Sequence, residues 1–532
     1  MRQMKYDGFF IPSARALVVT AVVTLVAASC GGGGGGGATS RKPEPNNPLI
    51  EGPITGGGGP DCCFILDGAI DLRTQGYTPG RPFFADVFFD PAEVGYQQKE
   101  YFMTGTATSY AFAKELGANG DWEVYPDRTA DYRTRIVVYR PIDPKRFNGT
   151  VVMEWFNVSG GIDAGPDWLQ TQTELRRSGY AYVGVSAQSV GVEGGGGAFD
   201  ISLKVVDPVR YGTLDHPGDS YSYDIFSQAG QAVLRPDGMD PLEGLKAKRL
   251  IAVGQSQSAA RLVTYHNAVH PLVDVFDAFL IHSRGAAAAP LVQFSAEVEE
   301  DEEVLYPVSP TLLRVDQPEP VITLQGETDL FRLGSIDARQ PDIGNLVLWE
   351  VAGSAHSDIY TTLKSPRDKG GDPVMADVTE ESEVRPPFIE CRFPANDGPM
   401  HWVAKAAIDN LDRAIRGGHK IPRAPRLATM LREDEFILDD HGNAKGGVRT
   451  PYVAAPVAIL SGEGQRGSAF CDLFGRTTLF DDTKLRELYP TRESYVDAIQ
   501  TSTDEAVAAG FLLPADGDLI KERATQVDIG GR

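Results

Sequence analysis

Basic residues are the minority charge of this sequence. Its 532 residues include 50 lysines and arginines against 73 aspartates and glutamates, which gives a formal net charge of −23. Nucleic acid and anionic membrane surfaces both require a basic face on their protein partner, and no basic patch with interleaved aromatic residues occurs. The charge therefore argues against both partners and favours a soluble protein.

Cysteine and histidine are also scarce, with 5 and 8 residues. No cysteine pair has zinc-finger spacing, so a metal held by thiolates is not expected. His266 and His270 have the spacing of zinc-binding histidines, but Asn267 stands where a metalloprotease has glutamate. The glycine run 194–197 lacks a following Lys-Ser/Thr, so a phosphate loop is not supported. We therefore expect neither a metal nor a cofactor.

The apolar run over residues 16–28 is too short to span a bilayer. Basic residues precede it, and it leads into Leu-Val-Ala-Ala-Ser-Cys at 25–30, which resembles a bacterial lipobox. We expect a lipoprotein signal peptide over 1–29 and a lipid on Cys30, which would anchor the protein in the cell envelope by its acyl chains only. If the cysteine occurs there by chance, the protein is simply secreted.

A tether rich in glycine and proline is expected over 30–60, and one catalytic domain over 61–532. Within that domain, the polar insertion at about 286–319 is either a solvated surface excursion or part of a lid. A C-terminal extension is expected from about 421 to 532. Four further cysteines allow one or two disulfides outside the cytoplasm; the pairing of Cys391 with Cys471 is favoured, and that of Cys62 and Cys63 stays open.

Residues 254–258, Gly-Gln-Ser-Gln-Ser, are the most informative feature of the chain. An apolar run ends at Gly254, Ser256 follows among small residues, and helix-forming sequence comes next. This pattern is typical of a nucleophile elbow, a strained strand-to-helix turn that presents a serine hydroxyl to a substrate. Ser258 occupies the place of the usual last glycine. The alternative is a serine that caps a helix after a buried strand.

Two later strand-like runs end in the other residues of a catalytic triad. The run 320–326 is followed by Glu327 and Asp329, and the run 346–351 is followed by a loop of small residues that ends at His356. The chain order serine, acid, histidine is that of the α/β-hydrolase fold. We expect Ser256 as nucleophile, His356 as base and Asp329 as the orienting acid, with Glu327 as the alternative acid.

A loop after an earlier strand-like run could form the oxyanion hole. The run 148–156 is followed by Asn157, Val158, Ser159 and Gly160. Backbone N–H groups of this loop and of Gln257 could stabilise the oxyanion, although an ordinary βα turn explains the loop equally well. Three nearby aromatic residues, Trp155, Phe156 and Trp168, could line an apolar pocket. His282, at the end of another strand-like run, could face that pocket or be a satisfied histidine at a strand end.

The sequence resembles a family of α/β-hydrolase-domain proteins from bacteria and fungi, from about residue 105 to the C-terminus. The segments that carry the resemblance are 155–161 with 166–168, 253–259, 326–329, 349–356, 396–402, 422–426 and 446–453. The resemblance implies an α/β-hydrolase fold, in which helices flank a mostly parallel central sheet, with insertions and a C-terminal extension. It implies an esterase-like triad but no particular substrate.

These residues favour a serine hydrolase that cleaves a small-molecule or polymeric carboxylic ester through an acyl-enzyme. An amidase, a lactonase or an acyltransferase would use the same triad. The alternative of another class is an envelope lipoprotein without activity that retains the fold as a binding module.

Overall fold

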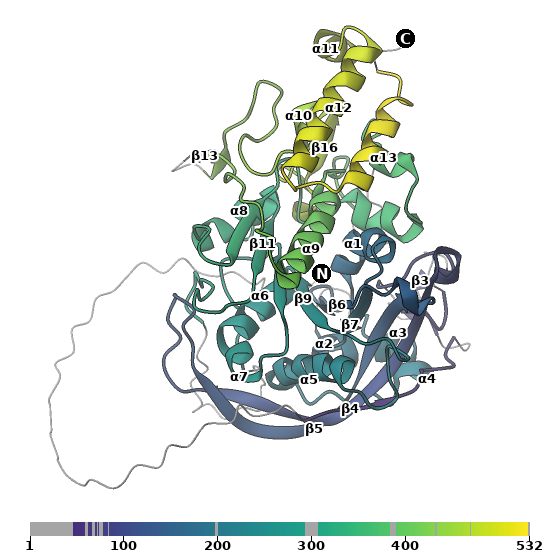
Figure 1. Ribbon diagram of the computed structural model, residues 1–532, viewed down its shortest axis with the longest axis vertical. Helices are drawn as coiled ribbons and strands as arrows, with labels where there is room; N and C mark the ends of the chain where they lie inside the picture. Colours follow the sequence, from purple (N-terminus) through teal and green to yellow (C-terminus); the bar gives the residue numbers. More distant parts are fainter. Residues whose placement is uncertain are drawn as a thin grey trace, which may run out of the picture. The chain divides into compact units, whose positions relative to one another are not determined.

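Ten strands of the described chain form one large sheet (Figure 1). The computed structural model describes residues 46–529 except 59–61, 66–69, 72, 74–77, 83, 197–200, 293–306, 383–389, 431–433 and 469. In sheet order, the strands are β12 (Leu346–Glu350), β11 (Val321–Gln325), β10 (Ala278–His282), β9 (Arg249–Gln255), β6 (Thr150–Trp155), β7 (Ala181–Val185), β5 (Val124–Pro141), β4 (Tyr96–Phe112), β1 (Leu49–Glu51) and β8 (Asp237–Gly238).

The neighbouring strands from β12 to β7 all run parallel, while β5 and β4 form a long antiparallel hairpin beside β7. Buried parallel strands carry apolar side chains on both faces. In β9, Leu250 and Ala252 belong to one hydrophobic core, and Ile251 and Val253 belong to the other. The continuous apolar runs of the sequence therefore fold as strands covered on both sides, as the α/β-hydrolase prediction requires.

Helices cover both faces of this sheet. The side chains of α5 (Ser222–Leu234) and α6 (Gln257–Thr264) join the first core, and those of α1 (Pro166–Arg177) and α9 (Met400–Arg416) join the second. The shorter elements before the C-terminal extension are β2 (Phe64–Ile65), β3 (Ile70–Asp71), α2 (Ser189–Glu193), α3 (Leu203–Val206), α4 (Pro208–Tyr211), α7 (His270–Val273) and α8 (Glu327–Phe331).

The C-terminal extension adds a third hydrophobic core, to which Tyr452, Tyr495, Ile499 and Ile520 contribute. Its helices α12 and α13 pack against each other (Figure 1). The elements of the extension are β13 (Thr429–Met430), β14 (Glu435–Phe436), α10 (Pro451–Ala454), β15 (Ala458–Ser461), β16 (Arg476–Leu479), α11 (Asp482–Leu488), α12 (Arg492–Ala508) and α13 (Pro514–Ala524). The hairpin of β15 and β16 leads from this extension toward the catalytic loops described below.

The structure corrects the expected end of the tether. Leu49–Glu51 is strand β1, which pairs with β4 in the main sheet, so a tether cannot extend from 30 to 60. Three residues are too few to show a period-2 pattern, and the glycines around them suggested a linker. The signal peptide at 1–29 and Cys30 lie outside the described residues. In the part of the chain that the structure describes, no helix has both the length and the hydropathy needed to cross a membrane.

The insertion expected at 286–319 is described except for 293–306, which includes its acidic run. Part of its second half packs against the fold, whereas Val308 and Val315 are exposed. Thr311 is fully buried and its N–H donates to the carbonyl of Ala286 at 2.9 Å, while Leu312 N–H donates to Ala118 O at 2.8 Å. These contacts anchor the segment before β11 on the loop at the tip of the β4–β5 hairpin.

Candidate active site

Ser256 occupies a strained turn between β9 and α6. Its φ of 62° and ψ of −116° lie in a region that L-residues rarely adopt, and strain of this kind is found at functional sites. A Cβ on Gly254 would lie 3.1 Å from Cβ of Ser258, which explains why both positions are small. Ser256 is partly exposed, whereas Ser258 is fully buried. Of the two serines, only Ser256 is both strained and accessible.

Asp329 and His356 form a buried pair at the carboxyl ends of β11 and β12. Oδ1 of Asp329 lies 2.6 Å from Nδ1 of His356, and Oδ2 accepts the Gly326 N–H at 2.6 Å. Asp329 is fully buried and His356 is 4% exposed, so water does not compete for this bond. Because a carboxylate only accepts hydrogen bonds, Nδ1 donates to Asp329, and in the neutral imidazole Nε2 then keeps its lone pair. This is the tautomer that a general base needs.

Two backbone contacts hold the histidine loop against the other catalytic loops. Gln255, the last residue of β9, donates through Nε2 to the carbonyl of His356 at 2.9 Å, and His356 N–H donates to Oγ1 of Thr328 at 3.2 Å. These bonds connect Gln255, the residue before Ser256, to His356, and they connect His356 to Thr328 in the acid loop, the segment after β11 that carries Asp329. No hydrogen bond joins the Ser256 hydroxyl to His356 among the described residues. Contacts of this kind are often long in a free enzyme.

Glu327, the alternative acid, does not face His356 and connects loops instead. Its Oε1 accepts the N–H of Gly353 at 2.6 Å and its Oε2 accepts the N–H of Gly462 at 2.9 Å. Burial raises the pKa of this carboxyl to about 7, although both backbone N–H groups lower it. The carboxylate therefore ties the acid loop to the histidine loop and to the loop after β15. The sequence indicated only that Glu327 lies beside the acid.

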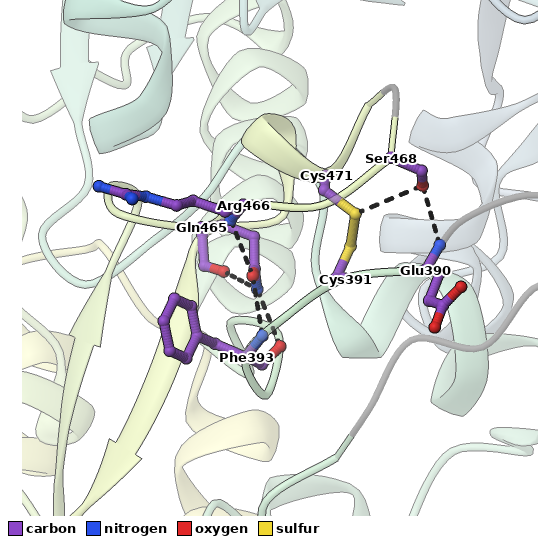
Figure 2. The surroundings of a disulfide bond; sticks show 8 residues. Glu390, Cys391, Phe393, Gln465, Arg466, Ser468 and Cys471 are labelled. Carbon is purple, nitrogen blue, oxygen red and sulfur yellow. Dashed lines mark hydrogen bonds between the residues drawn. A yellow bond between two sulfur atoms is a disulfide. The ribbon is translucent and has the colours of Figure 1, made fainter.

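The loop after β15 contacts both catalytic loops and is closed by a disulfide. Thr328 Oγ1 donates to Gly462 O at 2.7 Å, and Ser357 N–H donates to Leu473 O at 2.9 Å. Cys391 and Cys471 are bonded, which confirms the favoured pairing, with an S–S distance of 2.10 Å (Figure 2). Figure 2 also shows Gln465 bonded to the backbone of Phe393 on the neighbouring segment, as acceptor at 3.0 Å and donor at 2.9 Å. Cys62 and Cys63 are bonded to each other.

Negative charge gathers beside Asp329. Glu463 follows Gly462, and burial raises its pKa to about 7; Arg332 lowers that pKa, while Asp472 and Asp329 raise it further. Oε1 of Glu463 has no hydrogen-bond partner within the described ranges. Below about pH 7 the Glu463 carboxyl is therefore mostly protonated, which limits the negative charge beside Asp329.

The loop expected to form the oxyanion hole lies against the elbow strand. The Asn157 side chain donates to Gln255 O at 2.8 Å, and its Oδ1 accepts the Ser159 N–H at 2.9 Å. The Asn157 N–H itself donates to Ala164 O at 2.8 Å. Asn157 and Ser159 therefore cannot donate their backbone N–H groups to an oxyanion, which corrects the prediction for both. Among the described contacts of this loop, the N–H groups of Val158 and Gly160 stay available.

Gln257 offers the other expected donor, because it is the first residue of α6 and helices leave their first N–H groups without intrahelical partners.

The aromatic pocket predicted beside this loop is wrong. Trp155, Phe156 and Trp168 are all fully buried. Trp155 lies in the first core with Tyr223, whereas Phe156 and Trp168 lie in the second. Trp168 stacks on Tyr139 with ring centroids 4.0 Å apart. A strand covered on both faces sends alternate side chains into opposite cores, so adjacency to a catalytic loop did not mean adjacency to substrate.

His282 is the buried histidine at a strand end rather than a pocket residue. It is fully buried, its Nδ1 lies 2.7 Å from Oδ1 of Asp167, and its carbonyl accepts the N–H of Ser256 at 2.9 Å. Asp167 in turn lies beside Glu154, whose pKa is raised first by burial and then by the charge of Asp167. The side chain thus belongs to a polar cluster beneath the elbow, and its backbone positions Ser256.

The family match in sequence covers most of the chain. The family model described as alpha/beta hydrolase domain matches residues 50–522. No curated protein matches the chain. Similar solved structures include a putative dienelactone hydrolase from Klebsiella pneumoniae (10% identity, 46% of this chain and 85% of that chain, TM-score 0.24). A fungal esterase structure from Rhizomucor miehei is also similar (13% identity, 49% of this chain and 78% of that chain, TM-score 0.25). So is an esterase from Pyrobaculum calidifontis (13% identity, 41% of this chain and 72% of that chain, TM-score 0.24).

TM-scores this low carry no argument about activity, whereas the family match spans most of the sequence. The strand order, the mostly parallel sheet and this match agree on one assignment. The chain belongs to the alpha/beta hydrolase domain family.

Proposed function

We propose that this protein is a serine hydrolase that cleaves carboxylic esters through an acyl-enzyme. The observation that carries the proposal is the 2.6 Å contact between Asp329 and His356, on loops held next to the strained Ser256. The carboxylate fixes the tautomer of the imidazole, and the imidazole can then activate a hydroxyl that is a weak nucleophile on its own. The family assignment supports a hydrolase in general.

The proposed reaction has two halves. Oγ of Ser256 bonds to the ester carbonyl carbon while its proton moves to Nε2 of His356. Backbone N–H groups of Gln257 and of Val158 or Gly160 stabilise the resulting oxyanion. The carbon–oxygen bond to the alcohol then breaks, and His356 gives its proton to the departing alkoxide. Water, activated by the same histidine, attacks the acyl-enzyme, and the carboxylic acid leaves as Ser256 recovers its proton.

The test compares Ser256→Ala with its neighbour Ser258→Ala. We expect Ser256→Ala to lose both hydrolysis of a short activated ester and labelling by a fluorophosphonate, with the fold retained by circular dichroism. Ser258→Ala should retain most activity, because Ser258 is buried and is not the elbow residue. Absence of labelling in the folded wild type would contradict the proposal and favour a binding module. A panel of esters, lactones and amides would then identify the substrate class.

We also propose that the enzyme is anchored in the cell envelope through a lipid on Cys30. The support is the lipobox-like sequence at 25–30 together with disulfides, which persist mainly outside the cytoplasm. Mass spectrometry of the native N-terminus tests this. An acylated Cys30 supports the anchor, and an unmodified start downstream of residue 30 reduces it to secretion.

A further inference from the structure

A cluster of metal-ligand side chains lies away from the catalytic loops. His270 begins α7, Asp274 ends it in a left-handed conformation, and Glu319 stands two residues before β11. Each offers one ligand atom, and these atoms all lie within 4.8 Å of one another. The α6–α7 junction is a π-helical turn over Tyr265–Val269, and such turns are frequent at functional sites.

The histidine of this cluster is buried beside Glu319. His270 is 1% exposed, and its Nε2 lies 3.2 Å from Oε2 of Glu319, within ion-pair distance but without the geometry of a hydrogen bond. Oε2 of Glu319 lacks a hydrogen-bond partner in the described chain. Burying a carboxylate oxygen without a hydrogen bond costs free energy. A cation held between Nε2 and Oε2 would satisfy this oxygen.

The ring orientation is fixed by packing. The ring of His270 meets Phe279 edge to face, with centroids 4.9 Å apart and an interplanar angle of 77°. Phe279 is itself buried in the first core. The imidazole therefore cannot turn away, and Nε2 stays directed at Glu319 and at the mouth of the cluster, where Asp274 is exposed.

We propose that His270, Asp274 and Glu319 bind one divalent transition-metal ion of the Zn²⁺ class. Two carboxylates and a neutral imidazole supply a charge of −2 and a mixed nitrogen–oxygen ligand set, which suits Zn²⁺ better than Ca²⁺ or Mg²⁺. Ligands about 2.0–2.1 Å from a tetrahedral Zn²⁺ lie roughly 3.3 Å apart. The His270–Glu319 separation of 3.2 Å already has this value. The exposed Asp274 side chain would close the third position, and water would take the fourth.

The position of the cluster indicates a structural role. Glu319 precedes the amino end of β11, whereas Asp329 follows its carboxyl end, so the ion would lie at the opposite edge of the sheet from the triad. It would fasten α7 to the segment that leaves the 286–319 insertion. His266, the other histidine noted in the sequence, is not in the cluster; its ring centroid lies 6.5 Å from that of His270. The proposed partners of His270 are Asp274, four residues later in the sequence, and Glu319, 49 residues later.

The experiment measures Zn²⁺ binding to the full chain by isothermal titration, with the bound ion counted by mass spectrometry after dialysis. The wild-type protein should retain one Zn²⁺ ion per chain, and it should unfold at a higher temperature with Zn²⁺ than with a chelator. Glu319→Gln and His270→Gln should weaken binding by about tenfold or more and lose the thermal shift. Glu487→Gln, at an exposed carboxylate on α11, is the matched control and should bind like wild type.

If buried His270→Gln fails to fold, the partly exposed Glu319→Gln still decides the question, and ester hydrolysis reports its folding. Equal Zn²⁺ affinity in wild type and Glu319→Gln would overturn the proposal, as would wild type that binds no Zn²⁺. Binding of Ca²⁺ but not Zn²⁺ at these residues would overturn the choice of a transition metal.

Discussion

Replacing Asp329 by asparagine should trap His356 in the tautomer that cannot take the serine proton. Oδ2 of Asp329 accepts the Gly326 N–H at 2.6 Å, so the amide oxygen of an asparagine must occupy that side. Its NH₂ group then faces Nδ1 of His356, where Oδ1 now lies at 2.6 Å. Nδ1 must accept, and the imidazole proton moves to Nε2. The base is lost although the shape of the site is unchanged.

The expected loss follows from the corresponding change in a serine protease, where turnover falls on the order of 10⁴. That factor corresponds to about 5.4 kcal/mol of transition-state stabilisation. We expect kcat for a short activated ester to fall by several orders of magnitude, with KM little changed and slow labelling by a fluorophosphonate. Glu327→Gln is the control, since Glu327 contacts Gly353 and Gly462 rather than the imidazole. An Asp329→Asn enzyme within about tenfold of wild type, beside a folded but inactive Glu327→Gln, would refute this reasoning.

Two further changes probe the support of the site. Burial raises the Glu327 pKa from an ordinary 4.5 to about 7, so the folded state holds this proton more tightly than the unfolded state. The free energy of unfolding should therefore fall by up to about 3 kcal/mol from pH 4.5 to pH 7. Denaturant titrations should show a smaller fall for Glu327→Gln than for wild type, and an equal fall in both proteins would contradict this prediction. Separately, Cys391→Ser with Cys471→Ser removes a crosslink across 80 residues, worth about 4 kcal/mol in the chain-entropy model. Calorimetry should show a lower melting temperature and assays lower activity, whereas Cys62→Ser with Cys63→Ser should change activity little; equal effects would argue against a special role for the longer crosslink.

Local sequence was sufficient to predict the strands that position the candidate site. In a parallel sheet covered on both faces, each strand is one apolar run, and its last residues lie at the carboxyl edge of the sheet, so the positions of Ser256, Asp329 and His356 at that edge could be predicted from where the runs end. The same rule predicts a mostly parallel sheet. It does not say which face a side chain takes, and the aromatic residues near Asn157 were therefore misplaced.

Contacts between distant segments could not be predicted. Glu327 and Gly462 are 135 residues apart, and no pattern of apolar and polar residues in the sequence predicts that the Glu327 carboxylate accepts the Gly462 N–H. The prediction for Asn157 and Ser159 in the oxyanion loop was wrong for a related reason, because the Asn157 side chain accepts the Ser159 N–H and Ala164 O accepts the Asn157 N–H. Glu319 and His270 are 49 residues apart in the sequence, and only the fold brings their side chains within 3.2 Å.

The bond from Gly462 to Glu327 has a consequence for how the protein is made. The residues of the proposed triad all leave the ribosome before residue 357, but the loop that supports the segments after β11 and β12 is encoded more than 100 residues later. A nascent chain that ends shortly after His356 therefore contains the three proposed catalytic residues but lacks one partner of Thr328 and one of the two backbone partners of the Glu327 carboxylate. Under the proposed function, the contacts that support the site would be complete only near the end of synthesis.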